Sequence, residues 1–158
     1  MRPEENRAVT RIRIYVDTSV FGGCLDEEFR EDSVALLEMA RRGDAVLLVS
    51  SHLAHELVDA PEEVKAIFAA LPEECLERVS VTEEALQLQE AYIRAGILKP
   101  TSADDALHVA IATVARADLI VSWNFRHIVH FDRIRRFNAI NLFHGYPAVD
   151  IRSAKEVV

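Results

Sequence analysis

Oxygen-bearing side chains recur in this sequence at the ends of apolar segments, where a fold could gather them. They are Asp17, Ser50, Glu56, Asp104, Asp105 and Asn124. Hard cations such as Mg²⁺ and Mn²⁺ prefer oxygen ligands, and such an ion can polarise a phosphoryl oxygen and activate water. The pattern predicts a divalent-metal site. Without a cation, carboxylates held close together would repel one another, so we expect the empty site to be partly protonated or disordered.

Each of these residues also has a purely structural interpretation. Asp17 could end a strand or cap a turn, although a buried carboxylate at a sheet end is costly without a partner. Glu56 could be an ordinary solvated helix residue, which is what the pattern alone favours. Asp105 follows Ser102 by three positions and could complete a capping box, and Asn124 could be a turn residue. The helical wheel leaves open which of the two adjacent aspartates faces a site.

The six histidines show no zinc-like spacing with cysteines. They are His52, His55, His108, His127, His130 and His144. Only His127 stands out, because it closely follows an expected strand. The two cysteines, Cys24 and Cys75, lie far apart and outside any ligand spacing, so we expect buried thiols in a reducing compartment.

Strand-like and helix-like segments alternate along the chain. Strands are expected at 12–17, 45–49, 78–81, 119–122 and 139–142, and helices at 33–42, 51–58, 61–71, 83–95 and 102–117. This alternation predicts an α/β fold, a three-layer α/β/α sandwich with a mostly parallel sheet of about five strands. Such sheets bind ligands at the carboxyl ends of their strands. The expected organisation is a polar leader (1–11), one domain (12–145) and a C-terminal tail (146–158).

Composition restricts the class of protein. The chain has 158 residues, half of them hydrophobic, with only five glycines and five prolines, which suits one globular domain. It has no apolar run long enough to cross a bilayer, and its first residues lack the apolar core of a signal peptide. We therefore expect a cytoplasmic protein that does not associate with membranes.

The formal net charge of −8 is unusual for a protein that binds phosphate groups. A bound cation would offset part of this charge. In addition, residues 116–136 contain five arginines against two aspartates, a local balance of +3. These arginines could form a basic rim beside an acidic pocket, or they could be ordinary solvated surface.

Four segments together resemble the PIN domain, the fold of the VapC-type toxin ribonucleases. They are YVDTSVF (15–21), HELVDAP (55–61), SADDALHVAIA (102–112) and IVSWNFRHIV (120–129). Their order and spacing are similar to those of the family over residues 12–145, in a variant marked by SWNFRHIV.

The resemblance implies a role for each matching position. Asp17, Glu56 and Asp105 match the acidic catalytic and metal-binding positions, and Asp105 fits the third better than Asp104 does. At the fourth position, commonly aspartate, stands Asn124, which keeps a carbonyl oxygen but no charge. We expect weaker or more water-mediated metal coordination, which need not abolish activity.

Ser19 matches the small hydroxyl residue that steadies the first aspartate and is counted among the substrate-binding candidates. Arg126 and His127 are expected to touch the phosphate of the substrate.

The implied activity is Mg²⁺- or Mn²⁺-dependent hydrolysis of RNA, preferably single-stranded or looped, leaving a 5′-phosphate and a 3′-hydroxyl. The implied partners are an antitoxin protein and a second copy of the chain in a homodimer.

Three alternatives are considered. A haloacid-dehalogenase-type phosphatase needs an aspartate at the position of Ser19. A response-regulator receiver needs a lysine that is absent between Lys99 and Lys155. A PIN-like domain kept only for binding stays open, because of Asn124 and the acidic net charge.

Overall fold

The computed structural model describes residues 11–158, so the predicted leader lies outside the described residues except for Arg11. The strands are β1 (Ile12–Val16), β2 (Ala45–Ser50), β3 (Leu76–Val79), β4 (Leu119–Val121) and β5 (Asp150–Arg152). The α-helices are α1 (Thr18–Gly23), α2 (Arg30–Arg41), α3 (Ser51–Leu57), α4 (Glu62–Ala69), α5 (Glu83–Arg94), α6 (Ala103–Val114) and α7 (Phe131–Phe143). Three short 3₁₀ helices are η1 (Glu73–Cys75), η2 (Pro100–Ser102) and η3 (Ala154–Glu156).

The five strands form one sheet in the order β3-β2-β1-β4-β5, and every neighbouring pair is parallel. The predicted α/β fold with a parallel sheet of about five strands is confirmed. The chain runs outward from β1 through β2 to β3 and then returns to the other side of β1 at β4. Strand order therefore reverses at β1, and the carboxyl end of β1 is where such a sheet binds ligands.

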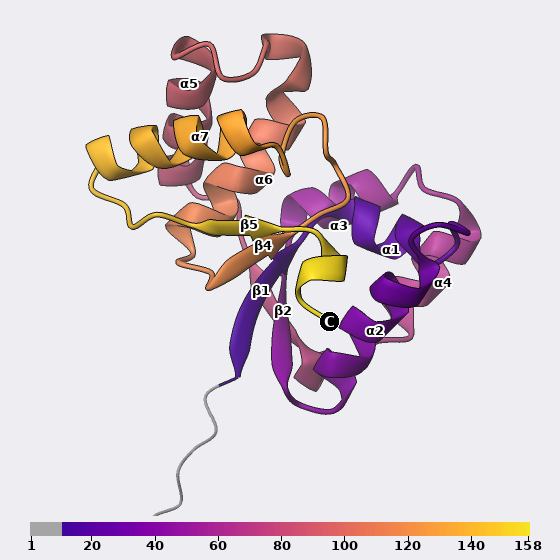
Figure 1. Ribbon diagram of the computed structural model, residues 1–158. Coiled ribbons are helices and arrows are strands. Elements are labelled where there is room, and N and C mark those ends of the chain that lie inside the picture. The colour runs from indigo at the N-terminus through magenta and orange to yellow at the C-terminus, as the bar shows by residue number, and fades with distance from the viewer. Residues whose placement is uncertain (1–10) are drawn as a thin grey trace, which may run out of the picture.

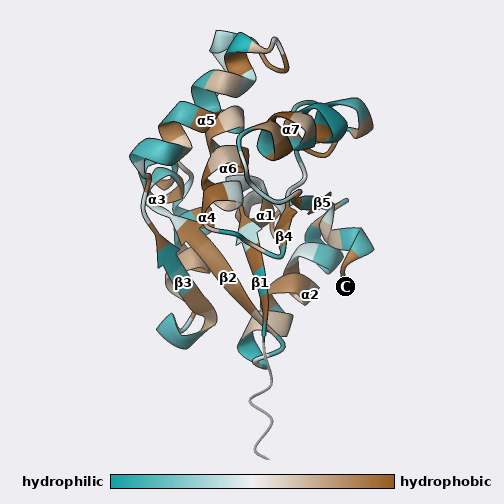
Figure 2. Cartoon of the chain, turned by 90° about the vertical axis from the view of Figure 1, so that its left-hand side faces the viewer, coloured by the Kyte–Doolittle hydropathy of each residue, from teal (hydrophilic) through white to brown (hydrophobic). Residues whose placement is uncertain are grey.

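Helices cover both faces of the sheet, as Figure 1 shows. One core packs alternate residues of β1 and β2, such as Ile14 and Leu47, against α1, α2, α4 and η3. The other packs the intervening residues, such as Tyr15 and Leu48, against α5, α6 and α7. All residues of β2 are buried, and its strongly hydrophobic colour in Figure 2 reflects burial on both faces. The three-layer prediction is confirmed.

Several helix ends carry residues that commonly begin or stop a helix. The side chain of Ser50 accepts a hydrogen bond from the Leu53 amide at the start of α3, and that of Thr82 accepts one from Ala85 at the start of α5. Gly43 and Gly96 follow α2 and α5 with φ angles of 83° and 75°, the left-handed conformation that ends a helix. Cys24 and Cys75 are buried free thiols, as expected.

The predicted fifth strand at 139–142 is wrong, because these residues belong to α7. Their apolar content continues a helical period: Phe137 and Asn141 both turn inward, where Phe137 packs on Tyr92 and Asn141 hydrogen-bonds to the Tyr92 hydroxyl. The actual fifth strand is β5, and Ile151 is its one buried residue. The sheet thus extends past the predicted domain boundary at residue 145. Within residues 11–158, no helix combines the length and the apolar character needed to cross a membrane.

Gly23 offers a test of the packing that supports β1 and β4. A Cβ atom at Gly23 would lie 2.4 Å from Ser33 Oγ and 2.8 Å from Trp123 Nε1, which are hydrogen-bonded to each other. We expect Gly23→Ala to destabilise the protein by about 1–3 kcal/mol in urea unfolding.

Gly22→Ala is the matched control, since nothing lies within 4 Å of the added methyl group. That change should be neutral or slightly stabilising, because alanine is the better helix former. Equal stability of the two variants would contradict this account of the packing.

Candidate functional site

A pocket of about 310 Å³ lies at the carboxyl end of β1. It is lined by Asp17, Thr18, Ser19, Gly22, Glu56, Ala60, Pro61, Val64, Asp105, His108 and Asn124. The four predicted metal ligands all reach it from different elements. Asp17 follows β1, Glu56 lies on α3, Asp105 lies in the first turn of α6, and Asn124 follows β4.

Asp17 is buried, with 4% of its surface exposed, and hydroxyl groups hold both of its carboxylate oxygens. Ser19 Oγ donates to Oδ1 at 2.5 Å, and Ser122 Oγ donates to Oδ2 at 2.7 Å. Ser122 reaches Asp17 because Val16 and Val121 pair across β1 and β4, so the next residue of each strand is also adjacent. Burial raises the pKa of the Asp17 carboxyl, although the serine hydrogen bonds and nearby His108 act in the opposite direction.

Glu56 is joined to a chain of buried polar groups. His108 Nε2 is 2.5 Å from Glu56 Oε1, and His108 Nδ1 is 2.6 Å from the Tyr15 hydroxyl. The Tyr15 hydroxyl in turn lies 3.0 Å from Ser50 Oγ. Partial burial acts to raise the pKa of Glu56, but the hydrogen bond from His108 and the charge of the neighbouring histidines lower it overall. Glu56 is therefore ionised at neutral pH.

Asp105 faces the pocket, whereas Asp104 is exposed and does not line it. Ser102 makes no side-chain capping hydrogen bond, so the capping-box interpretation of Asp105 is wrong. Instead, Asp105 Oδ2 accepts a hydrogen bond from His127 Nδ1 at 2.7 Å. The capping-box interpretation fails because the Asp105 side chain turns toward the loop after β4.

Asn124 combines the two interpretations considered for it. It lines the pocket, and its Oδ1 also accepts a hydrogen bond from the His127 amide at 2.9 Å, which organises the loop after β4. An amide oxygen has two lone pairs, so this contact leaves one available to a ligand.

The donor set suits a hard divalent cation, since three carboxylates and one amide oxygen line a single pocket. Within residues 11–158, neither lysine nor arginine forms an ion pair with Asp17, Glu56 or Asp105. Serine and histidine partners hold all three carboxylates in place.

Two histidines of this region had no role assigned from the sequence. His108 follows Asp105 by three residues and His52 precedes Glu56 by four, so each shares a helix face with an acidic residue. That spacing was a usable signal. It could not show that α3 and α6 would bring the two pairs into contact, which depends on the sheet order.

A second pocket, of about 620 Å³, lies beside the first and is basic. It is lined by Gly96, Ile97, Leu98, Lys99, Thr101, Ser102, Arg126, His127, Arg133 and Arg136. Three of the five arginines in residues 116–136 thus gather in one place. His127 connects the two pockets, because it lines the basic one and bonds to Asp105 in the acidic one.

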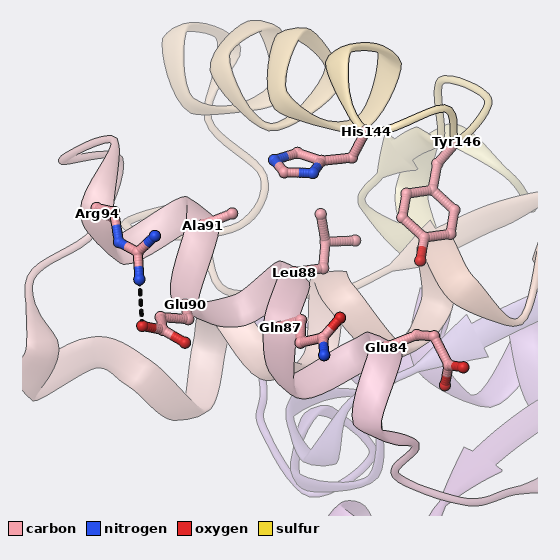
Figure 3. Close-up of a pocket in the computed structure, with 8 residues that line it drawn as sticks. All are labelled: Glu84, Gln87, Leu88, Glu90, Ala91, Arg94, His144 and Tyr146. Carbon is pink, nitrogen blue, oxygen red and sulfur yellow. Dashed lines mark hydrogen bonds and ion pairs between the residues drawn. The ribbon is translucent and has the colours of Figure 1, made fainter.

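Pocket size alone does not identify the site. Another hollow, of about 380 Å³, is formed by α5 together with His144 and Tyr146 (Figure 3). It contains Glu84 and a Glu90–Arg94 ion pair, and none of the predicted ligands lines it. We assign the site by its convergent oxygen donors.

Three solved structures have a similar fold over most of this chain. VapBC2 from Rickettsia felis bound to a DNA fragment from their promoter has a TM-score of 0.59 and 13% identity, covering 90% of this chain and 98% of that chain. FitAcB from Neisseria gonorrhoeae has a TM-score of 0.56 and 15% identity, with the same coverage of 90% and 98%. DNA-bound VapBC from Salmonella typhimurium has a TM-score of 0.53 and 16% identity, again over 90% and 98%. At these identities the likeness concerns the fold.

No curated protein matches the sequence significantly. The family model described as the PIN domain matches residues 13–126. Because this match spans well over half of the sequence, and the parallel sheet with its helices is the fold of the similar structures, the chain belongs to the PIN domain family.

Proposed function

We propose that this chain is a divalent-metal-dependent endoribonuclease and the toxin of a toxin–antitoxin pair. The observation that carries the proposal is the convergence of Asp17, Glu56 and Asp105 in one pocket at the carboxyl end of β1. A Mg²⁺ or Mn²⁺ ion bound there would supply Lewis acidity and offset the negative charge of the scissile phosphate.

The side chains have distinct roles in this proposal. Asp17 and Asp105 bind the ion, and Ser19 fixes the orientation of Asp17. Glu56, ionised and 29% exposed, binds the ion or orients the attacking water. Asn124 contributes a neutral oxygen. His127 is fixed by its bond to Asp105 and lies where a phosphate entering from the basic pocket would pass.

The basic pocket supports RNA as the substrate. A nucleic-acid backbone needs cationic contacts, and Lys99, Arg126, Arg133 and Arg136 supply them beside the acidic pocket despite the net charge of −8. The Arg133 guanidinium donates to the carbonyls of Ile97 and Arg126, which stiffens this wall. Arg126 is exposed and is the arginine best placed to reach a phosphate.

Removing a metal-binding carboxylate should abolish cleavage without unfolding the protein. Asp17→Asn and Asp105→Asn should each lower Mn²⁺-dependent cleavage of single-stranded RNA by about 100-fold or more, and EDTA should abolish it. Asparagine can keep the hydrogen bonds from Ser19, so the melting temperature of Asp17→Asn should not fall.

Asp104→Asn is the matched control and should cleave like the wild type, since Asp104 does not line the pocket. Cleavage that persists in Asp17→Asn would indicate a contaminating nuclease. A folded wild-type protein without any cleavage would favour the alternative, a PIN domain kept only for binding.

Binding to RNA should depend on Arg126. With EDTA present to prevent cleavage, Arg126→Ala should weaken binding and reduce the dependence of log K on log salt by about 0.7, the value for one phosphate contact with a single strand. Fluorescence anisotropy at several salt concentrations measures this slope.

Arg135→Ala is the matched control, because Arg135 lies over the Phe131 ring and does not line the pocket. An unchanged slope in Arg126→Ala would contradict the assignment of the basic pocket.

The proposal includes an antitoxin and a homodimer. The complexes named VapBC and FitAcB support the antitoxin, and a basic or amphipathic segment would suit the acidic surface of this chain. For the dimer, Phe131, Leu142 and Phe143 of α7 are 76%, 62% and 83% exposed, as expected of a surface that another chain covers. Light scattering after gel filtration should give twice the chain mass. A stable monomer at micromolar concentration would contradict the dimer.

A further inference from the structure

Beside the acidic pocket, two imidazoles and a carboxylate form a compact cluster. His52 and Glu56 lie one helical turn apart on α3, and His108 faces them from α6. One ligand atom from each of the three lies within 4.8 Å of the others. His52 Nε2 is 3.9 Å from Glu56 Oε1, and His108 Nε2 is 2.5 Å from the same oxygen. Only Glu56 and His108 also line the acidic pocket.

His52 is the member that the fold leaves unsatisfied. Its Nε2 is the one buried side-chain nitrogen or oxygen atom in residues 11–158 that lacks a hydrogen-bond partner. An unpaired buried polar atom of this kind is destabilising. Asp104 Oδ1 lies 3.4 Å from this atom without hydrogen-bond geometry.

We propose that His52, Glu56 and His108 form a second metal site, which takes a borderline transition cation of the zinc class. Two imidazole nitrogens and one carboxylate are a donor set that such ions prefer, whereas Mg²⁺ prefers oxygen alone. The exposed Asp104 carboxylate, beside His52, is available as a fourth ligand. This site is distinct from the oxygen-lined one, although the two share Glu56.

Hydrogen bonds hold the His108 ring in a fixed orientation, as is common for histidines that bind metals. Its Nδ1 is hydrogen-bonded to the Tyr15 hydroxyl, which fixes the ring with Nε2 toward Glu56. Tyr15 is bonded in turn to Ser50, whose side chain caps the helix that carries His52 and Glu56. Hydrogen bonding to the second ring nitrogen orients metal-binding histidines and strengthens them as ligands.

The short contact between His108 Nε2 and Glu56 Oε1 is the one that a bound cation would have to open. Ligand atoms about 2.0–2.2 Å from zinc lie roughly 3–4 Å from one another in a tetrahedral site. Binding would therefore widen the 2.5 Å separation of these two atoms. The distance of 3.9 Å between His52 Nε2 and Glu56 Oε1 already lies in this range.

The shared carboxylate has a consequence that rests on the proposed function. If Glu56 binds the catalytic ion or orients the attacking water during RNA cleavage, a zinc-class ion held by His52 and His108 would also bind Glu56 and remove it from that role. Zinc would then inhibit Mn²⁺-dependent cleavage. The existence of the second site does not depend on this, because binding can be measured without RNA.

The test is a titration of the full chain with Co²⁺ and with Zn²⁺. Wild-type protein should bind one Co²⁺ with the strong visible absorption of a four-coordinate, nitrogen-containing site, and Zn²⁺ should displace it. In His52→Gln the affinity for Zn²⁺ in calorimetry should fall at least about tenfold. His55→Gln is the matched control, since His55 lies on the same helix, is exposed and stands outside the cluster.

A second variant separates this site from the oxygen-lined one. Asp17→Asn with Asp105→Asn should keep tight Zn²⁺ binding even though RNA cleavage is lost. If this double variant loses Zn²⁺ binding while His52→Gln retains it, zinc occupies the acidic pocket and the proposal is overturned. Equal Zn²⁺ affinity in the wild type and His52→Gln would overturn it as well. Failure of RNA cleavage alone would concern only the proposed nuclease function.

Discussion

The burial of one carboxylate at the end of the central strand is the constraint on which the rest of the site depends. Asp17 lies where β1 ends between two neighbouring strands, with 4% of its surface exposed. A buried carboxylate is unfavourable unless its oxygens are satisfied, and here two serine hydroxyls supply the hydrogen bonds. Their effect is incomplete, because the pKa of Asp17 stays raised. The ionised carboxylate of Asp17 is therefore less stable here than in water, and a bound cation would stabilise it.

The strand alternation that buries Asp17 also organises its surroundings. Tyr15 turns toward α6, where its hydroxyl meets His108, and Val16 turns toward the opposite layer. One short strand thus positions an acidic ligand at its end and a supporting hydroxyl on its face. Glu56 and Asp105 each contact a histidine ring, so two of the three carboxylates have a hydrogen-bonding partner inside the protein. This internal pairing explains how an ordered acidic site coexists with the absence of lysine or arginine contacts in the described part of the chain.

Much of the fold follows from local patterns. The apolar run of β2, the caps at Ser50 and Thr82 and the glycines after α2 and α5 all acted as their chemistry predicts. The true fifth strand was missed because β5 has only three residues and one buried side chain, which is too few to show an alternating pattern. Edge strands of this kind are defined by pairing with β4, a contact between distant parts of the chain.

The site was predictable in its members and less so in their contacts. Strand-end position and the family resemblance indicated Asp17, Glu56, Asp105 and Asn124, and these residues do line one pocket. The Asp105–His127 and Glu56–His108 contacts span 22 and 52 residues, and no local rule brings such groups together. His52 and His108 have no ligand-like spacing with a cysteine, and they come together with Glu56 only when α3 and α6 pack together.

In the proposed function, Asp17, Glu56 and Asp105 jointly hold a divalent cation. Anomalous diffraction from a crystal soaked in Mn²⁺ would locate this ion without reference to activity. One manganese peak is expected in the pocket, within bonding distance of oxygens of Asp17 and Asp105. An ordered pocket without an anomalous peak at saturating Mn²⁺, or a peak bound only by other residues, would contradict it.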